Sequence, residues 1–171
     1  FGIQILCPDI NDSYFQWSGS NNKIQMGFMS IKGLKKKAVD IILDERKAGY
    51  FHSLDDFLVR VDLNLSDAMA LTNAGCFRNI ASELTHQGIA FKVAGFYLQD
   101  DSRKPFNRSS INSQLTMDEK YRLELDVFGY PISVHPITKY RPLLSSRIRY
   151  ARDIPNCFGQ SIYLIGIFIT R

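Results

Sequence analysis

The spacing of apolar and polar residues changes along the chain, and each change marks an expected structural segment. Near the start, Ile3 and Ile5, and later Ile24 and Met26, alternate with polar or small residues, as in β-strands. The stretch SGSNN between these two runs is typical of a turn. We therefore expect residues 1–30 to form extended segments that lead into the next domain.

From Gly33 onwards the apolar residues recur at the spacing of a helix. Asp40 and Lys47 lie outside the apolar face, and Gly49 ends the pattern. The sequence thus predicts one amphipathic helix after Gly33. Its expected inward face is Leu34, Ala38, Ile41 and Ile42.

Residues 51–77 repeat this two-helix pattern in a degenerate form. Ser53 is a good N-cap for the first helix, and Ser66 is the expected N-cap of the second. Gly75 is the expected stop signal. The connection VDLNL contains no glycine, so this second hairpin is expected to serve packing rather than DNA contact.

The remaining chain reads as helix, loop, helix and strand. Residues 79–98 are weakly helical, and residues 100–115 are polar without a period. Thr116 and Glu119 form a capping box for a helix that stops at Gly129, with Tyr121, Leu125 and Phe128 at helical spacing. The run QSIYLIGIFIT near the end is rich in β-formers, as in the first strand of a barrel.

Composition indicates a globular protein of a reducing compartment. Of the 171 residues 45% are hydrophobic and 22% are charged, which is enough to bury a core without disulfides. The three cysteines form no CxxC pair and favour the cytoplasm over secretion, and no apolar run is long enough for a membrane span. The chain begins at Phe1 and ends within a strand-like run, so we expect a fragment of a longer protein.

The net charge of +4 is concentrated in two stretches of the sequence. Residues 30–47 hold six basic residues against three acids, and residues 139–152 hold five basic residues and no acid. Basic clusters of this kind favour polyanionic partners. The three histidines are too scattered for a metal site.

The stretch IKGLKKKAVDIILDER combines a glycine with lysines at a helix start. A helix N-terminus exposes unpaired N–H groups, and a glycine before it lets a phosphate approach the backbone. Lysines on the first turn add charge-assisted contacts. This pattern predicts a helix-hairpin-helix module that binds the DNA backbone without reading sequence. The candidate DNA-binding residues are Lys32, Gly33, Leu34, Lys35, Lys36, Lys37 and Arg46, with Arg147 and Arg149 in the second basic stretch.

Two alternatives stay open for this hairpin. The lysines of a charge run are often merely solvated, and at a helix N-terminus they are unfavourable by about 0.3–1 kcal/mol each unless an anion is present. The module also usually has a second glycine where Lys35 stands. Lys35 either replaces a backbone contact with a side-chain contact or marks a weakened hairpin.

With these residues set out, the chain resembles the alpha subunits of bacterial DNA polymerase III, the C-family replicative polymerases. The matching stretches are ILCPDINDS, IQMGFMSIKGLKKKAVDIILDERKAGYFHSLDDFLVRV, LTNAGCF and LELDVFGYPISVHPITKY, within residues 3–77 and 116–140. GCF and LSDAMAL are slightly closer to the divergent, error-prone-type branch, and the two branches stay open.

The resemblance implies a mainly α fold with short β segments. We expect extended segments over residues 1–30, and a tandem helix-hairpin-helix domain over residues 31–99 that supports clamp and DNA binding. A polar linker follows over residues 100–115, then a helical connector over 116–153 and the first strand of a truncated OB-fold barrel over 154–171.

The resemblance also implies that the full-length subunit is a DNA-directed DNA polymerase that uses Mg²⁺ held by palm aspartates. We expect those aspartates to precede Phe1, and no cofactor or metal site is predicted in this chain. It should therefore incorporate no nucleotide alone. Its own acids have structural explanations at turns, helix starts and a loop: Asp9, Asp12, Asp55, Asp56, Asp100 and Asp101.

The family carries a sliding-clamp-binding peptide after the hairpin domain, with a glutamine, aliphatic residues and an aromatic residue. QGIAF supplies Gln87, Ile89 and Phe91, although the last two fit a helix core equally well. QLTMD, which begins at Gln114, lacks the aromatic residue. Two function hypotheses follow. The chain either binds duplex DNA and supports processivity, or it docks the clamp and other replisome subunits without binding DNA.

Overall fold

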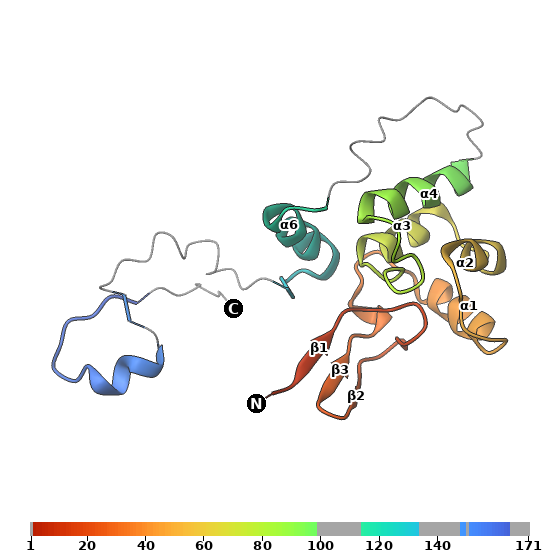
Figure 1. The fold of residues 1–171 in the computed structure, drawn as a ribbon. Coiled ribbons are helices and arrows are strands. Elements are labelled where there is room, and N and C mark those ends of the chain that lie inside the picture. Colours follow the sequence, from red (N-terminus) through yellow and green to blue (C-terminus); the bar gives the residue numbers. More distant parts are fainter. Residues whose placement is uncertain (1, 99–113, 134–147, 150, 165–171) are drawn as a thin grey trace. The chain divides into compact units, whose positions relative to one another are not determined.

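The computed structural model describes residues 2–98, 114–133, 148–149 and 151–164, and it forms two compact units, Phe1–Tyr130 and Pro131–Arg171. The described part is mainly helical, with one small mixed sheet (Figure 1). In the first unit the elements are β1 (Gln4–Leu6), β2 (Ser18–Ser20), β3 (Lys23–Gln25), the 3-10 helix η1 (Phe28–Ser30), α1 (Lys36–Arg46), α2 (Leu54–Arg60), α3 (Leu65–Asn73), α4 (His86–Leu98) and α6 (Met117–Phe128).

The three short strands confirm the expected extended segments. β3 lies between the other two, parallel to β1 and antiparallel to β2, with Ile24 opposite both Ile5 and Gly19. Asn21 and Asn22 turn the chain with positive φ angles of 48° and 59°, as a two-residue hairpin turn requires. The turn is thus narrower than expected, because the first three residues of SGSNN belong to β2.

The core lies between α1, α2 and α3. Phe57 is fully buried, and its ring centroid lies 5.1 Å from that of Phe51 and 4.8 Å from that of Phe77. These are ordinary distances for stabilising aromatic pairs. Ile42 of α1 and Leu71 of α3 are also fully buried, so both predicted hairpins contribute to one core.

The first predicted helix starts later than its apolar period suggested. Lys35 is the N-cap with extended backbone, and α1 begins at Lys36. Ala38 and Ile42 are buried as expected, and Val39 is buried as well. Leu34 and Ile41 are half-buried, because the buried face of α1 is centred closer to Val39.

The predicted N-cap of α3 was wrong by two residues. The side chain of Asn64, not Ser66, accepts a hydrogen bond from the Asp67 N–H at 2.9 Å. Asparagine and serine are equally good caps, so local preference did not separate them. The earlier start places Asp67 in the first turn, where it is buried.

The capping box of α6 is confirmed. Thr116 accepts a hydrogen bond from the Glu119 N–H, while the Glu119 carboxylate accepts one from the Thr116 N–H. Gly129 ends the helix with φ of +86°. α6 belongs to the unit Phe1–Tyr130, and its buried residues are Glu124, Val127 and Phe128; of the expected Tyr121, Leu125 and Phe128, only the last is fully inward.

The second unit contains the short 3-10 helix η3 (Ala151–Asn156) and a parallel bridge between Ile148 and Tyr163. This bridge is the only β-pairing among its described residues, so the expected OB-fold barrel is not shown. Residues 134–147 of the helical connector expected over 116–153 lie outside the described residues. In the described part of the chain, no helix is long and apolar enough to cross a membrane.

Candidate nucleic-acid interface

The hairpin before α1 is a tight turn with an open side. Ile31 is buried at the end of η1, and Gly33 has φ of +80°, a conformation that favours glycine. A Cβ placed on Gly33 would meet no atom within 4 Å. The glycine therefore serves the turn and leaves free space beside the backbone, as a bound anion would need.

The three consecutive lysines project from this turn. Lys35, Lys36 and Lys37 are exposed, and the first turn of α1 contains no acid. Within the described ranges no carboxylate forms an ion pair with any of the three. Lys36 and Lys37 also begin the helix, so their N–H groups have no intrahelical acceptor. Positive charge and unpaired donors thus coincide at one place.

The role of Lys35 is decided by Asp67. The Lys35 N–H donates to Oδ1 of Asp67 at 3.2 Å, while Oδ2 of the same carboxylate accepts from the Asn64 side chain at 2.6 Å. Lys35 has φ of −79° and ψ of 143°, which any residue adopts, so glycine is not needed there. Its N–H is therefore already bound, and only its side chain is left for a phosphate.

Lys32 is engaged with α6. Its N–H donates to the Val127 carbonyl at 2.8 Å, and its ammonium donates to the Leu125 carbonyl at 3.3 Å. A cation beside the last carbonyls of a helix is stabilised by the helix dipole. The structure thus places this predicted DNA contact at the C-terminus of α6.

Arg46 is also committed within the fold. One terminal nitrogen donates to the carbonyls of Ile10, Asn11 and Ser13 at 3.2, 2.7 and 2.7 Å. The guanidinium lies 4.9 Å from the centre of the Tyr14 ring. Arg46 therefore holds the segment before β2 against the end of α1, a long-range role that its position in the sequence did not signal.

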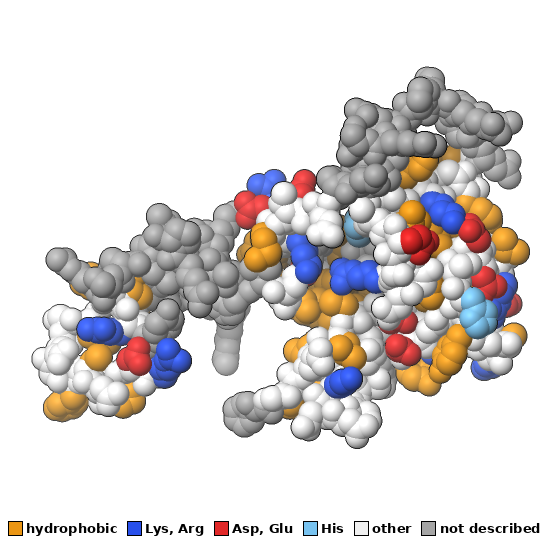
Figure 2. Space-filling model, in the orientation of Figure 1, with side chains coloured by type: hydrophobic (Ala, Val, Ile, Leu, Met, Phe, Trp, Pro, Cys, Tyr) orange, Lys and Arg blue, Asp and Glu red, His pale blue; other side chains and the backbone are white. Residues whose placement is uncertain are grey.

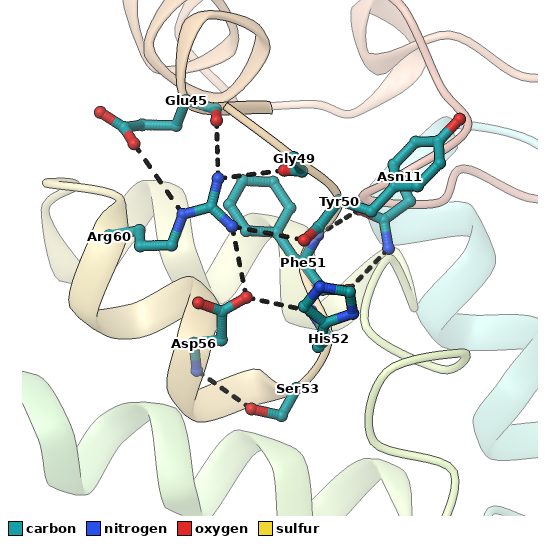
Figure 3. Close-up of polar contacts among 9 residues, drawn as sticks. All are labelled: Asn11, Glu45, Gly49, Tyr50, Phe51, His52, Ser53, Asp56 and Arg60. Atoms are coloured by element: carbon teal, nitrogen blue, oxygen red, sulfur yellow. Dashed lines mark hydrogen bonds and ion pairs between the residues drawn. The ribbon is translucent and has the colours of Figure 1, made fainter. Parts of the chain in front are cut away.

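Arg60 is an organising residue that the sequence analysis missed. Figure 3 shows its guanidinium between the end of α1 and the start of α2. It donates to the carbonyls of Glu45 at 2.6 Å and Gly49 at 3.0 Å, and it lies 4.5 Å from the centre of the Phe51 ring. It also forms an ion pair with Asp56 at 3.3 Å. Arg60 thereby fixes the loop that joins the two helices.

The second basic stretch is only partly described. Arg147 lies outside the described residues, whereas Arg149 is exposed and its N–H donates to the Tyr163 carbonyl at 3.0 Å. Arg149 belongs to the unit Pro131–Arg171. DNA contact by Arg147 and Arg149 therefore stays a prediction.

The candidate clamp-binding residues lie in the first two turns of α4. Ile89 is buried, whereas Phe91 is exposed. Gln87 and Phe91 are four residues apart and lie on one face of the helix, whereas Ile89 points to another side, so the three do not form one surface in this conformation. Ile89 is a core residue, in agreement with the alternative that it packs inside a helical core.

The described acids take part in local structure. The buried Asp9 carboxylate accepts from the N–H groups of Asn11 and Asp12 and from the Asn79 side chain. Burial raises the pKa of Asp9 above its ordinary value. In the described ranges, no group of three His, Cys, Asp or Glu side chains is arranged to hold a metal ion.

Comparison with known proteins finds relatives over nearly the whole chain. Residues 2–86 match the family described as helix-hairpin-helix motif. DNA polymerase III subunit alpha of Deinococcus radiodurans is 41% identical over 180 residues, covering 92% of this chain and 13% of that protein. The alpha subunit of Treponema pallidum is 29% identical over 186 residues, covering 96% of this chain and 16% of that protein.

The chain is homologous to a segment of DNA polymerase III subunit alpha. The subunit of Aquifex aeolicus matches the whole chain at 28% identity, over 15% of its own length. The resemblance drawn from the hairpin residues is therefore confirmed. The chain spans about one sixth or less of these relatives and contains their helix-hairpin-helix region, which is consistent with DNA binding within a polymerase.

Proposed function

We propose that this chain binds the duplex DNA backbone without sequence preference and supports the processivity of a bacterial DNA polymerase III alpha subunit. The observation that carries the proposal is the cluster of three exposed lysines at the start of α1, directly after the open glycine turn, where the first turn of the helix carries no acid. Phosphate oxygens placed there would meet mobile ammonium groups and the unpaired N–H groups of the helix start.

The contacts narrow the set of residues proposed to touch DNA. Gly33, Lys35, Lys36 and Lys37 form the contact surface. Leu34 is half-buried and anchors the turn. Two of the predicted contacts already bind backbone carbonyls: Lys32 at the end of α6 and Arg46 in the segment before β2. The proposed DNA binding therefore depends more on the charges of lysine side chains than on hydrogen bonds from backbone N–H groups.

The experiment is DNA binding by fluorescence anisotropy across a salt series. The variant Lys35→Glu, Lys36→Glu, Lys37→Glu should bind duplex DNA at least tenfold more weakly than the parent chain. The slope of log K against log salt should fall by about 0.9 for each phosphate that the variant no longer neutralises. Affinity should depend little on duplex sequence, because phosphate contacts carry no base information.

A matched control reverses three exposed basic residues elsewhere in the same unit: Lys23→Glu, Lys47→Glu and Arg122→Glu. It changes net charge equally, so it should weaken binding much less than the hairpin variant. Equal weakening by both variants would reduce the effect to overall charge. Unchanged binding in the hairpin variant would contradict the proposal and favour the alternative, a scaffold that docks the sliding clamp without touching DNA.

A further inference from the structure

An apolar surface lies directly beside the lysine hairpin. The segment before β2 runs along η1, where the Met29 N–H donates to the Phe15 carbonyl at 3.0 Å. The Trp17 indole N–H donates to the Ser30 hydroxyl at 2.6 Å. Ser30 is the last residue of η1, and the glycine turn follows it. Trp17 is therefore attached to the base of the hairpin.

A close backbone crossing holds this segment in place. A Cβ on Gly27 would lie 2.4 Å from the Gln16 carbonyl carbon and 2.5 Å from the Phe15 carbonyl oxygen. Real Cβ atoms do not approach backbone atoms that closely, so only glycine at position 27 lets the two chain segments cross here. The position of Trp17 relative to η1 is thus set by backbone packing and not by the tryptophan alone.

The side chains on this surface are large and accessible. Trp17 is 39% exposed and Met29 is 56% exposed. Figure 2 shows that apolar side chains reach the surface of the first unit in several places. Tryptophan is usually much more buried than this. The indole N–H is already engaged by the Ser30 hydroxyl, so a partner would meet the apolar part of the ring.

The same surface carries positive charge. The Lys36 ammonium lies 5.9 Å from the centre of the Phe15 ring, so the lysine cluster borders the apolar side chains directly. Aromatic rings next to basic side chains are the usual means of holding single-stranded nucleic acid, because bases stack on the rings while cations meet the phosphates. A purely apolar partner would leave these ammonium groups without an anion.

We propose that Trp17 and Met29 form a stacking surface for an unpaired nucleobase of DNA whose backbone is held by Lys35, Lys36 and Lys37. This inference rests on the proposed backbone contact, since those lysines place the phosphates. The preferred ligand is then a duplex that continues into a single strand, and a blunt duplex uses the lysines alone. Tyr14 is not part of this surface, because its ring borders Asp40 and Asp44 as well as Arg46.

The test uses Trp17 itself, the only tryptophan in the chain. Its fluorescence should be quenched by a duplex with an overhang of a few thymines and much less by the same duplex with blunt ends. By anisotropy the overhang duplex should bind about tenfold more tightly than the blunt one. Equal binding of both, without quenching by either, would overturn the inference even if duplex binding is strong.

Variants separate this inference from the proposed function. Trp17→Leu should remove the preference for the overhang and leave blunt-duplex binding unchanged, whereas Trp17→Phe should keep most of the preference. Tyr50→Leu is the matched control, because Tyr50 is 64% exposed and lies near Asp40, Asp44 and Lys47 instead of the three hairpin lysines. Circular dichroism and thermal midpoints should show that all three variants fold.

Each outcome of the comparison has one meaning. If the lysine variant binds neither ligand, the backbone contact stands, and the Trp17 variants then decide the stacking surface. If Trp17→Leu keeps the overhang preference, the stacking surface is wrong and the backbone contact is untouched. A preference that disappears equally in Tyr50→Leu would show a general effect of exposed aromatic residues and would also contradict the proposal.

Discussion

Neighbouring lysines of the hairpin differ in what their groups already bind. The N–H and ammonium of Lys32 are bound to carbonyls of α6, whereas only the N–H of Lys35 is taken. Lys36 and Lys37 keep both their charges and their helix-start N–H groups. The four lysines of this segment thus have different roles. Lys32 stabilises the fold, and the other three are candidate DNA contacts.

Lys32→Met should test this separation. The ammonium interacts with the C-terminal carbonyls of α6, so its loss should lower the free energy of unfolding by about 0.3–1 kcal/mol. Urea unfolding measures this. Duplex binding of Lys32→Met should fall less than that of Lys36→Met, and the reverse order would contradict the assignment of Lys32 to the fold.

Gly33→Ala should cost stability without a steric clash. The backbone there has φ of +80°, and a left-handed conformation costs a non-glycine residue about 1–2 kcal/mol. The free space beside Gly33 means that no further penalty is expected. Gly95→Ala is the control, since Gly95 lies inside α4 with free space around it. That change should stabilise the chain by up to about 1 kcal/mol, as measured by urea unfolding.

At the residue scale, the sequence predicted features that depend on a few neighbouring residues. Ser53 caps α2, Thr116 caps α6, and Gly75 and Gly129 end helices with positive φ, as expected. It did not predict the bonds of Arg46 and Arg60, whose partners lie far along the chain. Long side chains at helix ends look alike in sequence whether they face water or distant carbonyls.

Among the elements, α1 and α2 are joined by Arg60, and the loss of this residue should be costly. Arg60→Lys removes the planar donor group that binds the carbonyls of Glu45 and Gly49. Hydrogen bonds that involve a charged group contribute about 1.5–3 kcal/mol, so the free energy of unfolding should fall by that amount. Urea unfolding measures it, and Arg122→Lys at an exposed site should change stability by less than about 0.5 kcal/mol.

The start of α4 should make stability depend on pH. Burial, and then the nearby Arg78 charge, lower the pKa of His86 from its ordinary value of 6.5, against a hydrogen bond with the Thr72 backbone. Its Nε2 is buried without a hydrogen-bond partner among the described residues. The unfolded state therefore binds more protons below pH 6.5, so stability is lost as the pH falls from there towards the lowered pKa.

Urea unfolding at about pH 7.5 and about pH 5.5 should reveal this loss, and His86→Gln should reduce it. His52→Gln is the control, because His52 is exposed. An equal pH dependence in His86→Gln and the parent chain would show that another group is responsible.

At the element scale, helices were easier to predict than their packing. The periods and caps predicted α1, α2, α3 and α6, although two boundaries and part of the inward face of α6 differed. The order of the three-stranded sheet and the contact of Lys32 with α6 depend on contacts between distant residues. Local patterns do not contain that information.

For the molecule as a whole, several of the described acids have partners that suit structural roles. Asp55 pairs with Lys92 at 2.6 Å, and Asp67 accepts from the Lys35 N–H. We therefore expect the 171-residue chain to incorporate no nucleotide in a primer-extension assay with Mg²⁺. Template-dependent extension by the purified chain would contradict this expectation, and a full-length alpha subunit serves as the positive control.

At the scale of the whole molecule, the sequence was most informative about the protein family. The hairpin residues and the order of the motifs pointed to the family, because the motifs keep a defined spacing within residues 3–77 and 116–140. Charge alone did not reveal that the fold already uses Lys32 and Arg46, and the DNA-binding set itself stays a prediction. The position of Trp17 beside the hairpin depends on its contact with Ser30, which local sequence patterns do not show.

The bond between the Lys35 N–H and Asp67 has a consequence for movement along DNA. A set of backbone N–H groups binds one phosphate at a fixed position, and that phosphate must leave before the next one can bind. Lysine side chains can instead move their ammonium groups from one phosphate to the next while the protein backbone keeps its position. We expect a polymerase segment built in this way to resist dissociation while offering little friction to translocation.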